Sequence, residues 1–149
     1  MEPQKRTIHY DAIELYPLSF DFIGKLNYLK LIGTSLENEF QTFHTMDWNL
    51  KIKINSNFTL YKIQGNATEV ILPHKYDVVF FDAFSPDKQP ELWTKELFSK
   101  IFESMNPEGI LTTYCAKGIV KRVLKEVGFT VQRINGPPGK RHMVRALKI

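Results

Sequence analysis

Asp82 is the residue whose type and position most clearly indicate chemistry, because its carboxylate ends an apolar run and begins a proline-rich loop. Residues 76–81 are apolar apart from one aspartate, which is typical of a strand covered on both faces of a sheet. An acid at the carboxyl end of such a strand lies where open α/β sheets bind their ligands. Pro86 and Pro90 keep residues 83–90 out of a helix, so this loop is predicted to be rigid. The alternative is that Asp82 only caps the segment that follows it.

Glu14 is a second candidate, because it closes a strand predicted over residues 7–14. An acid in this position commonly accepts hydrogen bonds from the ribose hydroxyls of an adenine-containing cofactor, although it can equally face water. The four histidines show no metal-ligand spacing, and the single cysteine, Cys115, has no obvious histidine partner. The sequence therefore predicts no metal centre, and Cys115 is expected to be a small buried residue rather than a nucleophile.

The elements that must position these acids alternate between strands and helices. Strands are predicted over residues 7–14, 50–54, 58–63, 76–82, 109–114, 129–134 and 141–148, and helices over residues 18–32, 65–72, 91–105 and 116–127. The strands on either side of Asn55-Ser56-Asn57 indicate a local antiparallel hairpin. The alternation predicts a doubly wound α/β sheet, and the strands around Gly136-Pro-Pro-Gly139 predict an antiparallel edge at its carboxyl-terminal end.

Length and composition indicate a single domain over residues 1–149, because 149 residues with 43% hydrophobic content can bury one substantial core. A single cysteine excludes an internal disulfide, and no apolar run approaches the ~18 residues of a membrane span. Residues 1–6 are polar and no suitable apolar segment follows, so no signal peptide is predicted. The cytoplasm is the expected location.

Basic residues gather in the last third of the chain. Residues 117–149 contain nine Lys or Arg and one acid, a balance of +8, whereas residues 1–116 contain eleven Lys or Arg and fifteen acids, a balance of −4. Such an asymmetry is the footprint expected of a phosphate-binding surface. The alternative is a solvated helix face followed by an ordinary basic tail.

Four segments resemble one family, the methyltransferase domain of the bacterial MnmC-type tRNA (5-methylaminomethyl-2-thiouridine) methyltransferases. DAFSPDKQPELW (residues 82–93) is similar to the family's signature, which joins an acid, an aromatic residue, two prolines and a tryptophan in one order. TTYCAKGIVKRVLKEVGFTV (112–131) resembles the family's next strand, helix and strand, GKRHMVRA (139–146) its closing basic strand, and IHYDAIELYPL (8–18) its second strand. The similarity covers most of the chain from Ile8 onward.

The resemblance implies methyl transfer from S-adenosylmethionine to the primary amine of a modified wobble uridine in tRNA. Asp82 would orient this amine and accept its proton. Phe84 and Trp93 would face the splayed base, unless they pack in the core. The residues implied in cofactor binding are Glu14, Asn66, Ala67, Asp82 and Ala83, and those implied in binding the RNA substrate are Phe84, Pro86, Trp93, Lys117, Lys121, Arg122, Lys140 and Arg141. Asn66 stands where the family has an acid, so it brings an acceptor oxygen without a charge.

The resemblance also implies a Rossmann-like class I methyltransferase sheet, of which one part is missing. Such a sheet begins with a strand that leads into a glycine-rich loop and a helix, and no glycine precedes Gly24 here. The family would place this strand at the centre of the sheet, between the strands that end at Glu14 and Asp82. The chain is therefore interpreted as an amino-terminally shortened methyltransferase domain, and the alternative is a sheet that closes in another way. For the function, the alternatives are a non-catalytic RNA-binding remnant and a methyltransferase of another substrate.

Overall fold

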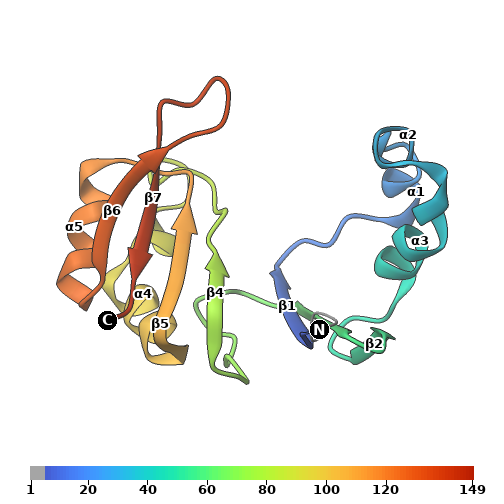
Figure 1. Ribbon diagram of the computed structural model, residues 1–149, viewed down its shortest axis with the longest axis horizontal. Coiled ribbons are helices and arrows are strands. Elements are labelled where there is room, and N and C mark those ends of the chain that lie inside the picture. Colours follow the sequence, from blue (N-terminus) through green and yellow to red (C-terminus); the bar gives the residue numbers. More distant parts are fainter. Residues whose placement is uncertain (1–5) are drawn as a thin grey trace, which may run out of the picture. The chain divides into compact units, whose positions relative to one another are not determined.

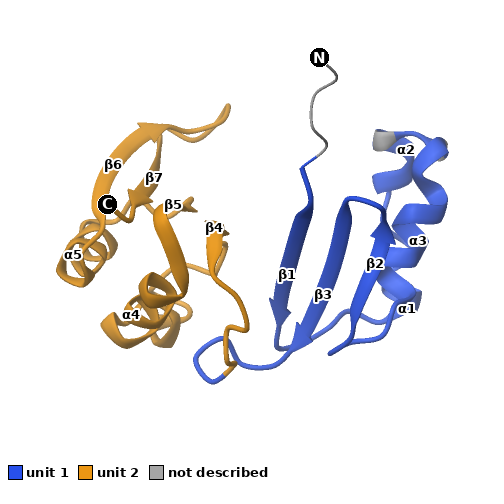
Figure 2. Ribbon diagram, turned by 60° about the horizontal axis from the view of Figure 1, so that its bottom comes forward, with its two compact units in different colours: residues 1–69 blue, residues 70–149 orange. Residues whose placement is uncertain are grey.

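A computed structural model describes residues 6–149, apart from the side chains of Ile32 and Thr34. The chain divides into two compact units, unit 1 with residues 1–69 and unit 2 with residues 70–149 (Figures 1 and 2). Each unit contains its own β-sheet and its own helices.

The sheet of unit 1 has three strands, β1 (Ile8–Glu14), β2 (Lys51–Asn55) and β3 (Phe58–Gln64). β3 lies in the centre, parallel to β1 and antiparallel to β2, so β1 is an edge strand. Asn55 closes the β2–β3 turn, because its Oδ1 accepts a hydrogen bond from Asn57 N at 2.9 Å. The predicted hairpin and the predicted strand that ends at Glu14 are therefore confirmed.

Three helices and a 3₁₀ turn lie between β1 and β2, where the sequence predicts one helix over residues 18–32. They are α1 (Phe20–Ile23), α2 (Tyr28–Ile32), η1 (Thr34–Leu36) and α3 (Glu37–Thr45). The single long helix is wrong because Gly24 and Asn27, two poor helix formers, separate α1 from α2. α3 was not predicted, since its sequence is polar and none of its residues is fully buried.

Lys62 on β3 closes the carboxyl end of α3. The last four carbonyl groups of a helix have no partner within it, and Lys62 Nζ donates hydrogen bonds to two of them, Phe43 O at 2.9 Å and His44 O at 3.5 Å. The ammonium also lies 4.8 Å from the ring centroid of Trp48. Desolvation of this buried group lowers the pKa of Lys62, an effect that Asp47 partly opposes. The positive charge of Lys62, a residue of β3, thus stabilises the carboxyl end of α3.

Replacing Lys62 by methionine is expected to lower the free energy of unfolding by about 1–3 kcal/mol, because two helix-end carbonyls lose a charged donor. Methionine retains most of the apolar stem of lysine, so packing changes little. Denaturant unfolding followed by circular dichroism measures the change. Lys53→Met, at an exposed position of β2, is the matched control. Equal midpoints for the two variants would show that the hydrogen bonds of Lys62 contribute nothing to stability.

The sheet of unit 2 has four strands in the order β4-β5-β7-β6. β4 (Tyr76–Phe80) is an edge strand parallel to β5 (Met105–Thr113), whereas β7 (His142–Leu147) is antiparallel to both β5 and β6 (Thr130–Asn135). The predicted antiparallel carboxyl-terminal edge is therefore confirmed. β5 begins earlier than predicted, and the Asn-Pro-Glu-Gly turn forms an irregularity inside it, with Glu108 at a φ of 64°.

The helical elements of unit 2 are η2 (Pro90–Trp93), α4 (Lys95–Ser104) and α5 (Gly118–Val127). α4 and α5 pack against the same face of the sheet (Figure 2), where Phe98, Leu111, Leu124 and Val144 are fully buried. The predicted helix over residues 91–105 is divided at Thr94, whose Oγ1 accepts a hydrogen bond from Leu97 N at 3.3 Å and so begins α4.

The opposite face of this sheet carries no helix of unit 2 among the residues described. Side chains alternate along a strand, so Val78 and Phe80 lie opposite Val79 and Phe81, which pack against the core. Val78 is 48% exposed and Phe80 is 67% exposed. The sequence predicts a sheet covered on both faces, and unit 2 by itself covers one. Parallel strands are normally covered on both faces, so the exposed face of β4 is one that a further element would be expected to cover.

Candidate cofactor and substrate site

The carboxyl ends of β1 and β3 bring Glu14 and Gly65 together in unit 1. Glu14 pairs with Gln64, and Gly65 N donates a hydrogen bond to Glu14 O at 3.0 Å. The Glu14 side chain is exposed, and its Oε1 accepts a hydrogen bond from Tyr16 N at 2.8 Å. This contact holds the carboxylate at the strand end and leaves its second oxygen able to accept from the hydroxyl groups of a ligand.

Asn66 and Ala67 follow at the same edge of the sheet, but the side chain of Asn66 is already used. Its Oδ1 accepts hydrogen bonds from Thr68 N at 3.0 Å and Thr68 Oγ1 at 2.9 Å, and its Nδ2 donates to Glu69 Oε1 at 3.5 Å. Both lone pairs of the amide oxygen are therefore occupied within the loop. The resulting Asx turn replaces the helix predicted over residues 65–72, which is wrong. An adenine amino group would have to displace one of these hydrogen bonds.

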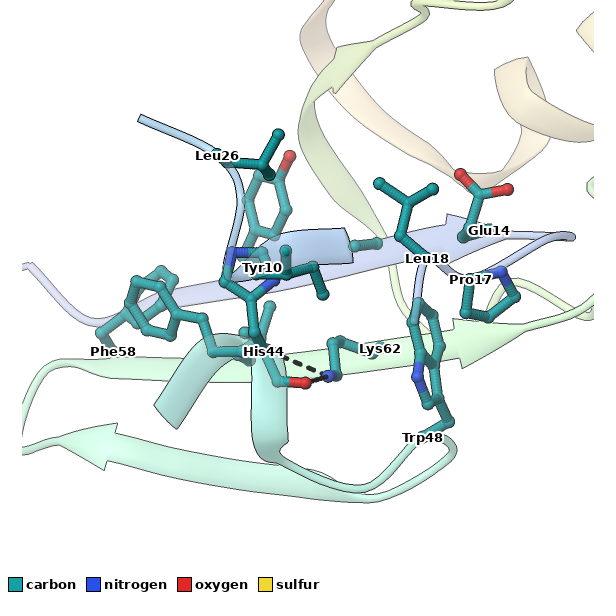
Figure 3. A pocket seen from close by; sticks show the side chains of 13 residues that line it. Tyr10, Glu14, Pro17, Leu18, Leu26, His44, Trp48, Phe58 and Lys62 are labelled. Carbon is teal, nitrogen blue, oxygen red and sulfur yellow. Dashed lines mark hydrogen bonds between the residues drawn. The ribbon is translucent and has the colours of Figure 1, made fainter. Parts of the chain in front are cut away.

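A cavity of about 460 Å³ lies between the strands and the helical segment of unit 1 (Figure 3). Its lining is mostly apolar, with Tyr10 and Glu14 from β1 and Lys62 from β3. His44 comes from α3, and Trp48 comes from the turn before β2. Burial, and to a lesser degree Lys62, lower the pKa of His44. The sequence does not indicate this cavity, because part of its wall comes from α3. The apolar face of α3 is too weak for this helix to be predicted from sequence.

Asp82 lies just beyond β4, at the carboxyl end of the parallel pair formed by β4 and β5. Phe80 pairs with Thr112, and Phe81 N donates a hydrogen bond to Thr112 O at 2.9 Å, so Asp82 leaves the sheet beside the end of β5. Its side chain is exposed. This is the position that the sequence predicts, at the edge where α/β sheets bind ligands.

Side-chain hydrogen bonds fix the loop that follows Asp82. Phe84 N donates to Gln89 Oε1 at 3.1 Å, and Phe84 O accepts from Trp93 Nε1 at 2.8 Å. Ser85 O accepts a further hydrogen bond from Gln89 N at 3.0 Å. These contacts hold the backbone of Phe84 from both sides while its ring remains 74% exposed. These hydrogen bonds restrain the loop, and residues 83–89 form no helix, as the prolines predict.

Trp93 is a core residue rather than an exposed aromatic face. Its side chain is 6% exposed, and its ring centroid lies 5.1 Å from that of Phe81 and 6.1 Å from that of Phe98. The structure therefore supports the core-packing alternative for Trp93. Phe84 remains as the exposed ring of the loop, and Pro86, which is half-buried, follows it closely.

Three of the nine basic side chains in residues 117–149 have protein partners. Lys117 forms an ion pair with Asp87 of the loop. Arg145 donates two hydrogen bonds to Gln132 Oε1, from Nε at 3.1 Å and Nη2 at 2.6 Å. Lys148 Nζ donates to Phe102 O at 2.6 Å, at the end of α4. The remaining six are Lys121, Arg122, Lys125, Arg133, Lys140 and Arg141.

Two further features bear on the class of protein. No helix in the described part of the chain has the length and apolar character needed to cross a membrane. Within residues 6–149, His, Cys, Asp and Glu side chains form no group of three or more that could hold a metal ion. Cys115 is half-buried, and its backbone N donates a hydrogen bond to Thr113 Oγ1 at 3.2 Å.

Sequence comparison with known proteins gives consistent matches. A family model described as S-adenosyl-L-methionine-dependent methyltransferase matches residues 33–149. The chain is 33% identical, over 95% of its length, to the tRNA 5-methylaminomethyl-2-thiouridine biosynthesis bifunctional protein MnmC of Campylobacter hominis. It is 29% identical, over 93% of its length, to the protein of the same name from Pseudoalteromonas translucida. It covers 21% and 22% of these proteins, so it spans about a fifth of the length of these curated relatives.

Solved structures share the fold. The crystal structure of MnmC2 from Aquifex aeolicus is 26% identical, with a TM-score of 0.69 over 94% of this chain and 43% of that chain. A methyltransferase from Pyrococcus furiosus is 21% identical, with a TM-score of 0.53 over 93% of this chain and 61% of that chain. The predicted Rossmann-like methyltransferase fold is therefore confirmed.

Proposed function

Because this chain belongs to the family of S-adenosyl-L-methionine-dependent methyltransferases, we propose that it methylates the aminomethyl group of a modified wobble uridine in tRNA. The relatives support this substrate, since their name refers to the biosynthesis of tRNA 5-methylaminomethyl-2-thiouridine. The observation that carries the proposal is Asp82, an exposed carboxylate at the carboxyl end of β4, beside a loop with a fixed backbone. The cytoplasm, where tRNA is modified, is the proposed location.

Asp82 acts on the amine in this proposal. Methyl transfer to nitrogen needs a free lone pair, and a primary alkyl amine is mostly protonated near neutral pH. The carboxylate accepts a hydrogen bond from the amine, holds the nitrogen in position, and takes up the proton that it loses. S-adenosylmethionine supplies the methyl group when it is bound.

Phe84 offers a surface for the base. A wobble nucleotide must leave its stack to reach a protein pocket, and exposed aromatic rings then replace the lost stacking. The ring of Phe84 is exposed two residues after Asp82, and its backbone is held by Gln89 and Trp93. Trp93 therefore contributes indirectly, by positioning Phe84.

The residues described here fit the cofactor in part. The second carboxylate oxygen of Glu14 is suited to ribose hydroxyls, whereas the amide oxygen of Asn66 is occupied. We propose that a glycine-rich strand and helix from outside residues 1–149 complete the site. This proposal is supported by β1 and β4, because each is an edge strand of the sheet in its own unit and each leads to one of the two candidate acids.

Methyl transfer by a version extended with a glycine-rich strand and helix tests the proposed function. Labelled S-adenosylmethionine and tRNA that carries the aminomethyl group should give labelled wobble uridine, and tRNA without that group should not. RNA binding without methyl transfer would favour the non-catalytic alternative. Methylation of a different substrate, with the tRNA unlabelled, would show that the chain is a methyltransferase of another substrate.

Replacing Lys140 and Arg141 together by alanine is expected to weaken tRNA binding and to flatten its salt dependence. Each neutralised phosphate releases condensed counterions, so loss of two contacts should reduce the slope of log affinity against log salt by up to about two units. The measurement is tRNA affinity over a salt series for residues 1–149. Lys25→Ala with Lys30→Ala, an equal charge change at exposed positions of unit 1, is the control. If the slope of log affinity against log salt is the same for the two double variants, Lys140 and Arg141 do not contact the phosphates of the tRNA.

A further inference from the structure

His142 begins β7 at the same edge of the unit 2 sheet from which Asp82 leaves β4. Thr113, the last residue of β5, pairs with Val144 in the antiparallel direction, so His142 lies beyond the carboxyl end of β5. β4 is parallel to β5 and ends beside it, since Phe80 pairs with Thr112. His142 and Asp82 therefore belong to one edge of one sheet.

The charges of three cations act on His142, and each cation comes from a different element. Val144 is fully buried against the helices, so His142, two residues away on the same strand, lies on the helix-covered face. Arg133 of β6 pairs with Val144 and thus shares that face, which is covered by α5, the helix that contains Lys121. Arg141 comes from the β6–β7 loop.

The electrostatics of His142 agree with this placement. Its pKa is lowered by desolvation and then by the positive charges of Arg133, Arg141 and Lys121. No carboxylate contributes to this shift, and Glu126 is the single acid in residues 117–149. β5 brings no charge beside the cluster, because its last residues are threonines. Among the described residues, the ion pair of Lys117 with Asp87 involves none of these cations, so the positive charge of the cluster is available to an anionic ligand.

We propose that Lys121, Arg133, Arg141 and His142 form one phosphate-binding cluster for the RNA backbone, in which His142 gains a proton as the phosphate binds. This inference rests on the proposed function, because it supplies a phosphate contact at the sheet edge that carries Asp82. It adds Arg133 and His142 to the basic residues that the sequence singled out. The other face of the hairpin takes no part, since Arg145 is held there by Gln132.

The sign of the pH dependence follows from linkage. Three cations disfavour the protonated imidazole in the free protein, and a bound phosphate favours it, so the pKa of His142 is higher in the complex. Affinity is then greatest below the pKa of the free protein and falls as the pH rises through the pKa of the complex. The total gain is about tenfold for each unit by which binding raises the pKa.

Affinity for an anticodon stem-loop RNA, measured from about pH 5.5 to about pH 8, tests the cluster on residues 1–149. The parent should bind more tightly as the pH falls, and His142→Gln should lose most of that change. His74→Gln, the same substitution at an exposed histidine before β4, should keep the parent's pH dependence. Identical pH profiles for the parent and His142→Gln would overturn the proposal.

Nuclear magnetic resonance titration of the His142 imidazole gives a second readout that needs no variant. The RNA should raise its pKa, whereas inorganic phosphate at the same total phosphate concentration should raise it much less. An unchanged pKa of His142 with RNA, or an equal rise with inorganic phosphate, would contradict the proposal that the cluster binds the RNA backbone. Neither result depends on methyl transfer, so a failure of this inference is distinct from a failure of the proposed function.

Discussion

Replacing Asp82 by asparagine is expected to lower the rate of methyl transfer to tRNA by about 10²–10⁴-fold in the version extended with a glycine-rich strand and helix. Asparagine has nearly the same shape, but it cannot take up the proton that the amine nitrogen must lose. The loop should keep its structure, because the hydrogen bonds that fix it come from Gln89 and Trp93. The measurement is single-turnover methylation with saturating tRNA and cofactor.

Asp77→Asn is the matched control, since it makes the same change at the other end of β4. Asp77 Oδ1 accepts a hydrogen bond from Asn106 Nδ2 at 2.8 Å, which an asparagine oxygen can also accept. Its rate should stay close to that of the parent. If the two variants turn over equally fast, Asp82 is a structural cap and the proton leaves by another route.

The second large effect concerns the cofactor. Residues 1–149 by themselves are expected to bind S-adenosylmethionine weakly, and addition of the glycine-rich strand and helix should raise the affinity by about a hundredfold or more. Two backbone donors directed at a charged group, at about 1.5 kcal/mol each, are sufficient for this change. Glycine is needed there because a side chain would keep the backbone away from the cofactor. Titration calorimetry on both proteins measures the difference.

The same extension with its glycines replaced by valine is the control, because it supplies the strand and helix without the close backbone approach. It should restore folding stability and leave cofactor affinity low. Micromolar affinity of residues 1–149 alone would contradict the prediction, and it would mean that Glu14 and its neighbours form a sufficient site without the loop.

The strands of this fold could be predicted from sequence because each has a local signal. Residues 58–63 alternate apolar and polar side chains, and residues 76–80 form an apolar run, so their existence did not depend on distant contacts. The helical segment of unit 1 lacks such a signal. α3 is held at its end by Lys62, which lies 17 residues beyond Thr45, and no local pattern reveals a cap that arrives from another strand.

The candidate site was predictable to the extent that it lies at strand ends. Asp82 and Glu14 occupy the predicted positions, because an apolar strand followed by an acid fixes where the carboxylate leaves the sheet. Partners were not predictable. The burial of Trp93, the Asx turn of Asn66 and the ion pair of Lys117 with Asp87 each depend on a neighbour that only the folded chain supplies.

The exposed edge of β4 also determines how residues 1–149 behave when they are concentrated. β4 pairs with β5 on one side only, and its other side, with Val78 and Phe80 exposed, is a template on which another chain can add its own strand, which leads to self-association. Asp77 is the single charged side chain within Tyr76–Phe80. When the β4 strands of two copies come together, their Asp77 carboxylates repel each other and so oppose self-association. The charge of Asp77 therefore limits self-association during synthesis and folding. This role ends once another strand pairs with the free side of β4.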